Sequence, residues 1–163
     1  MGMISDFLLV DPTEISSRFP GWHQPEPGWM PSDEGSDADL NGLEVLEFKS
    51  ITTVMLDVLV EALGADCTMD TPFVSPSAEQ ILTVLPTAVV RAMADLDGDA
   101  LETWIDAVVE GWREDIATIR DESTRLSGLA TCTRESWAPV LQSIAALAQR
   151  CPPPKVMAMF NCV

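Results

Sequence analysis

The two ends of this chain constrain its fold more than any other feature. Residues 3–10 form a short apolar stretch. In the tail over residues 156–161, residues 156, 158 and 160 form one alternating set of side chains and residues 157, 159 and 161 form the other. Alternation with a period of two is typical of β-strands, whereas most of the chain between these ends has helical periodicity. Because a strand needs a neighbour for its backbone hydrogen bonds, we expect the two ends to meet in one small sheet.

Helical periodicity is clearest in the second half of the chain. One apolar stripe predicts a long helix continued by Ile116 and Ile119, with Asp99 as its N-cap and Glu102 as the capping partner. The stripe consists of Leu101, Trp104, Ile105, Val108, Val109 and Trp112. A second stripe begins at Trp137 and predicts a helix that starts near Ser136 and ends before three consecutive prolines.

The first half predicts shorter helices. D-P-T-E at residues 11–14 has the form of a helix start with Asp11 as cap, and Pro20 ends that helix. Residues 43–63 are predicted to be helical from a face that consists of Ile51, Val54, Met55, Val58, Leu59 and Ala62. Ser75-Pro76 predicts another helix start, with a break near Leu85 because Pro86 does not fit a helix interior.

Length and composition predict a single domain. At 163 residues, with 47% hydrophobic residues, the chain is long enough to bury about 70% of its extended surface around one core. We therefore expect an α+β fold over residues 1–163, mostly helical, with a small sheet that pairs the N- and C-terminal strands. Residues 19–42, rich in proline and acidic residues, are the one long irregular loop.

The formal net charge of −17 argues against two classes of partner. Such a charge repels phosphate backbones and anionic headgroups and favours basic proteins, so neither nucleic acid nor a membrane surface is expected. The seven arginines are scattered along the chain, and no basic stripe emerges. Without a signal peptide or a long apolar segment, the chain is predicted to be cytoplasmic, with Cys67, Cys132, Cys151 and Cys162 as free thiols.

Four segments resemble a known family. These are the M-G-M-I start, the D-P-T-E-I helix opening, F-V-S-P-S-A-E-Q-I at residues 73–81, and a last helix that runs into a C-terminal strand. Together they are similar to the YfbM-like family of bacterial proteins of unknown function. The helix that corresponds to residues 43–63 lacks the Trp and His of the family pattern. The resemblance implies a small α+β fold and supplies no catalytic residues.

The sequence contains no recognisable catalytic or metal-binding constellation. His23 is the only histidine, and it lies in the irregular loop where nothing fixes its geometry. The D-L-D-G-D segment at residues 95–99 has its glycine at the fourth position, where a calcium loop needs the sixth. No nucleotide-binding or nucleophile-elbow motif is present. The residues therefore favour a protein that is not an enzyme and needs no cofactor.

The irregular loop is the best candidate for a partner-binding site. Residues 19–48 contain seven acids and no Lys or Arg. Aromatic side chains among residues that are charged only negatively are suited to binding a basic protein surface. The predicted partner-binding residues are Trp22, Glu26, Trp29, Asp33, Glu34, Asp37 and Asp39. In the alternative interpretation, both tryptophans pack onto the protein's own core while the acids face solvent.

These features predict a binding protein, of the immunity or antitoxin type, that masks a basic partner such as a toxin. One alternative is a small-molecule-binding protein or an enzyme with an unrecognised pocket between sheet and helices. The other is a homo-oligomeric structural protein that buries Met157, Met159 and Phe160 on a C-terminal edge strand. The sequence does not decide the oligomeric state.

Overall fold

The computed structural model describes residues 4–32, 38–49, 53–64 and 68–162. Its strands are β1 (Ile4–Val10), β2 (Glu44–Lys49), β3 (Phe73–Val74), β4 (Gln80–Val84) and β5 (Val156–Cys162). Its helices are the 3₁₀ turn η1 (Pro12–Glu14), α1 (Ile15–Arg18), α2 (Thr53–Glu61), α3 (Thr87–Ala94), α4 (Gly98–Ala117), α5 (Glu122–Thr131) and α6 (Arg134–Gln149). The chain thus has the predicted α+β fold.

The two terminal strands lie side by side inside one antiparallel sheet of order β2-β1-β5-β4-β3. Their register runs from Ile4 opposite Cys162 to Val10 opposite Val156, so the predicted pairing of the two ends is confirmed. The edge-strand prediction for β5 is wrong, because β1 and β4 flank it. Met157, Met159 and Phe160 are buried within the chain itself.

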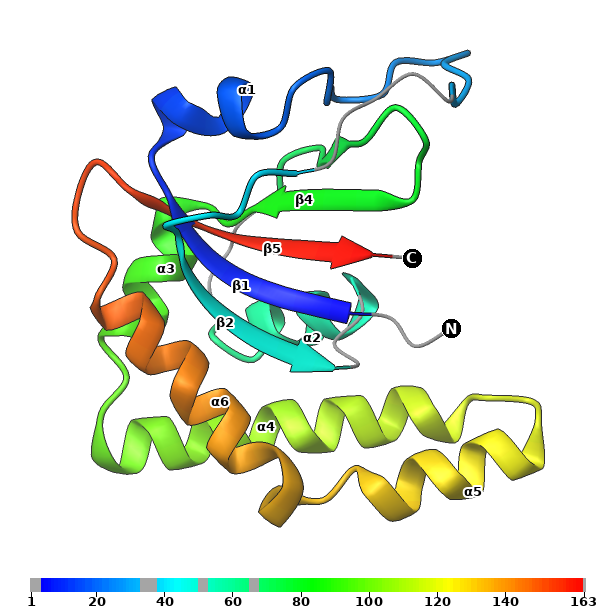
Figure 1. Cartoon of the computed structure of the whole chain (residues 1–163). Coiled ribbons are helices and arrows are strands. Elements are labelled where there is room, and N and C mark those ends of the chain that lie inside the picture. Colours follow the sequence, from blue (N-terminus) through cyan, green and yellow to red (C-terminus); the bar gives the residue numbers. More distant parts are fainter. Residues whose placement is uncertain (1–3, 33–37, 50–52, 65–67, 163) are drawn as a thin grey trace.

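The sheet has two covered faces. Phe7, Leu9 and Met157 belong to the larger apolar core, under helices α2, α3, α4 and α6, and we call this the helix face. Leu8 and Phe160 point to the other side, the loop face, where Phe19 and Trp22 cover them. Figure 1 shows α1 and the long loop on one side of the sheet and α4, α5 and α6 on the other. Both faces are apolar because both are buried.

The helix predicted over residues 43–63 is wrong in its first part. Residues 44–49 form β2, which pairs with β1 from Ile4 opposite Lys49 to Leu9 opposite Glu44. None of the residues on the predicted helical face lies before residue 51, so periodicity never supported a helix there. Leu46 and Phe48, two residues apart, pack on the helix face instead. The helix itself begins at Thr53.

The helix predicted from Ser75-Pro76 is also wrong. That segment is the turn of the β3–β4 hairpin, where the Ser75 hydroxyl accepts a hydrogen bond from the Gln80 N–H at 3.1 Å. Ser-Pro is compatible with a turn as well as with a helix start. Pairing of β4 with β5, from Gln80 opposite Cys162 onward, decides between them. A helix does begin after Pro86, as α3, but it follows strand β4 and is not the restart of a broken helix near Leu85.

The long amphipathic helix is confirmed as α4, with Trp104, Ile105, Val108, Val109 and Trp112 buried. Its N-cap is Asp97, and Asp99 lies in the first turn, contrary to prediction. The helix ends at Ala117, before Ile119. A separate helix, α5, follows and was not predicted; Asp121 caps it by accepting a hydrogen bond from the Thr124 N–H at 2.8 Å.

Candidate partner-binding surface

The long loop is attached to the loop face of the sheet by aromatic side chains. Trp22 stacks on Phe160 with ring centroids 6.0 Å apart and meets Phe19 edge-on at 5.1 Å. Only 9% of Trp22 is exposed. Its packing matches the alternative interpretation of this tryptophan, a lid on the core. Trp22 therefore cannot be an exposed anchor for a partner, and its indole N–H has no hydrogen-bond partner.

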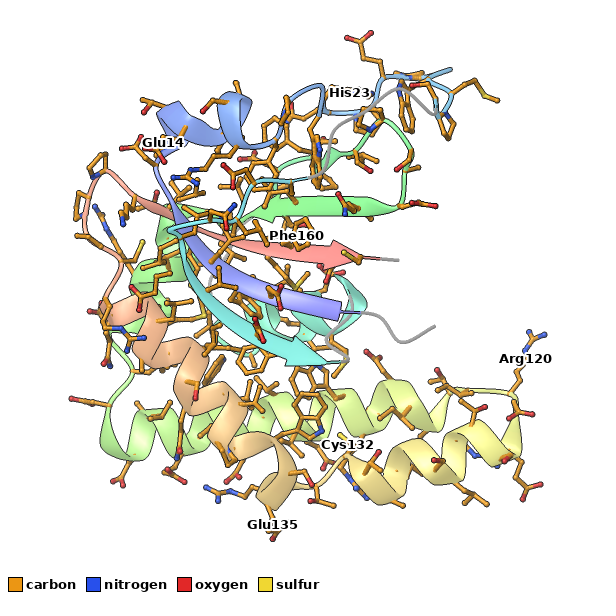
Figure 2. All side chains as sticks on the ribbon, in the orientation of Figure 1. Glu14, His23, Arg120, Cys132, Glu135 and Phe160 are labelled. Carbon is orange, nitrogen blue, oxygen red and sulfur yellow. The ribbon has the colours of Figure 1, made fainter. Side chains whose placement is uncertain are left out.

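Backbone hydrogen bonds then fix the middle of the loop to the β3–β4 hairpin. His23 and Val74 exchange two N–H···O bonds, of 3.3 and 2.9 Å. Farther along, the Ser32 N–H donates to the Pro76 carbonyl at 2.8 Å. Figure 2 shows His23 in this outer part of the loop and Phe160 in the sheet. The loop is thus irregular in backbone conformation yet held at defined points.

Arg18 holds the returning part of the loop. Its guanidinium is paired with Glu14 at 2.7 Å and donates to the carbonyl of Asn41 at 2.9 Å. The Asp39 N–H also donates to the Arg18 carbonyl at 2.8 Å. Hydrogen bonds from the Asn41 backbone and side-chain amides hold the pKa of Asp39 below its ordinary value. Asp39 is exposed and stays ionised at neutral pH.

The described outer part of the loop carries one unusually exposed apolar side chain. Met30 is 78% exposed and lies next to Trp29, which is half-buried with its ring edge-on to His23 at a centroid distance of 4.8 Å. Glu26 is exposed in the same turn. Among the described residues, Leu126 is the other large hydrophobic residue with high exposure. We call Glu26, Trp29, Met30 and Asp39 the loop surface.

Only some of the predicted site residues lie on the loop surface. Glu26, Trp29 and Asp39 lie on the loop surface, Trp22 lies beneath it, and Asp33, Glu34 and Asp37 fall outside the described residues. Met30 was missed by the sequence reasoning. The signal was available, because Met30 follows Trp29 in a stretch with no periodicity that could bury either side chain.

The described part of the chain also contains histidine and cysteine side chains. No three His, Cys, Asp or Glu side chains gather there as a metal site. The ring of His23 has its Nδ1 3.3 Å from the Gly21 carbonyl, and its Nε2 is buried without a partner. Cys132, Cys151 and Cys162 are free thiols, as predicted, whereas Cys67 lies outside the described residues. Burial raises the pKa of all three thiols, so they are protonated at neutral pH.

One carboxyl group is buried in the sheet. Asp6 on β1 is 7% exposed, shares the loop face with Leu8 by strand alternation, and lies opposite Glu47 on β2. Burial, and secondly the charge of Glu47, raise the pKa of Asp6 above its ordinary 3.8, while a hydrogen bond involving the Phe48 backbone opposes the shift. The folded state therefore retains this proton at pH values where the unfolded chain has released it.

Asp6→Asn is expected to raise the melting temperature at about pH 7 and to change it little near pH 3. Below its ordinary pKa, Asp6 is protonated and its burial costs no charge. As the pH rises through the raised pKa of the folded state, wild type must bury a carboxylate, which lowers its stability, whereas the Asn side chain stays neutral. Thermal melts over this pH range measure the effect. The matched control is Asp57→Asn, an exposed acid on α2 that removes one charge without relieving burial. An equal gain in both variants would contradict the assignment.

No helix in the described ranges is long and apolar enough to cross a membrane. No family model, no curated protein and no solved structure matches this chain. The resemblance to the YfbM-like family therefore stays a prediction.

Proposed function

We propose that this protein binds a basic protein partner through the loop surface. The observation that carries the proposal is the exposure of Met30 beside Trp29, in a segment whose charged residues are all acidic. A flexible thioether and an indole supply apolar contact area, and the exposed carboxylate of Glu26 in the same turn favours a positively charged surface. An immunity or antitoxin role, in which the bound partner is a basic effector such as a toxin, is the specific form of this proposal.

The attachment of the loop also supports the proposal. Trp22 and the His23–Val74 bonds hold the first part of the loop against the sheet, and Arg18 holds the returning part against α1. A surface held in this way loses less conformational entropy on binding than a free loop would lose. The net charge of −17 adds long-range attraction that accelerates the encounter with a basic partner.

The test compares two exposed hydrophobic residues. Met30→Ala removes the apolar centre of the loop surface, and Leu126→Ala removes another exposed hydrophobic side chain, on α5, which is 57% exposed. Tagged wild type and both variants are used for affinity capture at low salt, and any basic protein retained is identified, purified and titrated calorimetrically. We expect Met30→Ala to weaken this complex by roughly 30-fold, as at a hot spot of about 2 kcal/mol, and Leu126→Ala to leave it unchanged.

Two outcomes would overturn the proposal. One is that wild type retains no basic protein at low salt. The other is that Leu126→Ala weakens the complex as much as Met30→Ala, which would place the contact elsewhere. A rise in the dissociation constant with added salt is expected, because the acidic part of the surface acts through screened charge.

A further inference from the structure

Two basic side chains of this acidic protein line one cavity. Arg91 of α3 and Lys155, in the connection between α6 and β5, both lie at the rim of a hollow of about 190 Å³. No acidic residue lines it. Its floor is apolar, formed by side chains that include Leu85, Val90 and Val156.

Neither basic side chain forms a hydrogen bond or an ion pair within the described part of the chain. Arg18, Arg134 and Arg150 form ion pairs with carboxylates. Arg113 and Arg125 donate to backbone carbonyls. Of the described basic side chains, Arg91, Arg120 and Lys155 remain without a hydrogen bond or ion pair, and two of these three line the same cavity.

Two basic side chains at one cavity are unexpected in a chain with 26 acids and nine Lys and Arg residues. The charge of Lys155 acts on Asp11, but the Asp11 carboxylate is held by Thr13, accepting from its hydroxyl at 2.6 Å and from its N–H at 2.9 Å. Another cavity, between α2 and α4, is lined by Glu61, Glu114 and Asp115. The cavity lined by Arg91 and Lys155 is thus a local positive site on a negative protein, and its electrostatic field concentrates anions there.

We propose that this cavity binds a small organic anion. Its charged group, a carboxylate or phosphate, lies between Arg91 and Lys155, and a short hydrocarbon part contacts the floor at Leu85 and Val90. The volume is below the range of about 300–1,000 Å³ of drug-sized sites, so the ligand is small. Burial raises the pKa of the Cys151 thiol, also in the lining, so no thiolate competes with the anion.

This site is separate from the loop surface. Figure 1 shows the α6–β5 connection at one end of the sheet and the outer part of the long loop at the opposite end. Of the apolar side chains in its lining, Leu85 and Val90 belong to the core on the helix face and Val156 to the cluster on the loop face, and neither Trp22 nor any other residue of the long loop lines it. Anion binding therefore neither requires nor excludes the proposed protein partner, and the two can be tested independently.

The test is an NMR titration of the amide resonances with sodium acetate, sodium hexanoate and sodium phosphate, at constant ionic strength maintained with chloride. Constant ionic strength separates binding from general screening of the 26 acids. We expect saturable shifts at Thr87, Arg91, Cys151 and Lys155. Hexanoate should bind more tightly than acetate, by roughly fourfold for each CH₂ group that reaches the floor. Phosphate tests whether the charged group alone suffices.

Matched charge variants decide whether the cavity is the site. The double variant Arg91→Gln, Lys155→Gln is expected to weaken hexanoate binding at least tenfold. Both side chains are exposed and make no internal bonds, so the variant is expected to melt like wild type. Arg120→Gln removes the third unpaired charge, which Figure 2 shows pointing outward at the α4–α5 connection, and should bind like wild type. Equal shifts in wild type and the double variant, or shifts spread over the surface, would overturn the proposal.

Discussion

Trp104→Ala is expected to lower the free energy of unfolding by about 3–5 kcal/mol, as for other buried tryptophans cut back to alanine. Trp104 is 2% exposed and lies on the buried stripe of α4. Its indole N–H donates to the Leu59 carbonyl of α2 at 3.2 Å. The substitution would therefore leave a cavity and also an unpaired carbonyl in the core between α2 and α4. Chemical denaturation monitored by circular dichroism measures the change.

Two variants complete this experiment. Trp104→Phe keeps most of the ring burial and loses the hydrogen bond, so its loss of stability should be smaller than that of the alanine variant. Leu126→Ala, on the exposed side of α5, should stay within about 0.5 kcal/mol of wild type. If Trp104→Ala unfolds like wild type, the helical register of α4 is wrong.

The second large effect is expected at Trp22. Trp22→Ala should cost about 3 kcal/mol, because its ring covers Phe160 and Phe19 on the loop face. In wild type the buried indole N–H has no partner, and an unpaired buried donor costs about 1–3 kcal/mol. The substitution removes this donor, and this gain offsets part of the stability lost with the buried ring. Trp22→Phe removes the donor and keeps an aromatic ring, so its stability should stay within about 1 kcal/mol of wild type.

Trp29→Ala is the matched control for this experiment. Trp29 is half-buried and contacts His23 at the outer part of the loop, so about 1 kcal/mol is expected from its removal. Denaturant midpoints of the three variants measure the difference. Equal small losses for Trp22→Ala and Trp29→Ala would show that Trp22 is not a lid on the core, and would restore Trp22 beside Trp29 as a candidate anchor.

Elements whose residues repeat at a local spacing could be predicted from the sequence. The α4 stripe from Trp104 to Trp112 and the alternating tail of β5 were both correctly assigned, because each pattern is complete within its own segment. The pairing of β1 with β5 also followed, since two apolar strands at the ends of a helical chain needed partners. The long loop was recognised from its prolines and its lack of periodicity.

Segments that depend on a distant partner could not be assigned in this way. Residues 44–49 and 80–84 became β2 and β4 because the edges of the β1–β5 pair were open to them, a condition that neither local sequence contains. The burial of Trp22 likewise depends on Phe160, at the other end of the chain. The same holds for charge: the scattered arginines predicted no basic site, yet the fold places Arg91 and Lys155 at one cavity. Local periodicity is determined by the sequence alone, whereas strand neighbours, buried faces and shared cavities arise only when distant residues pack together.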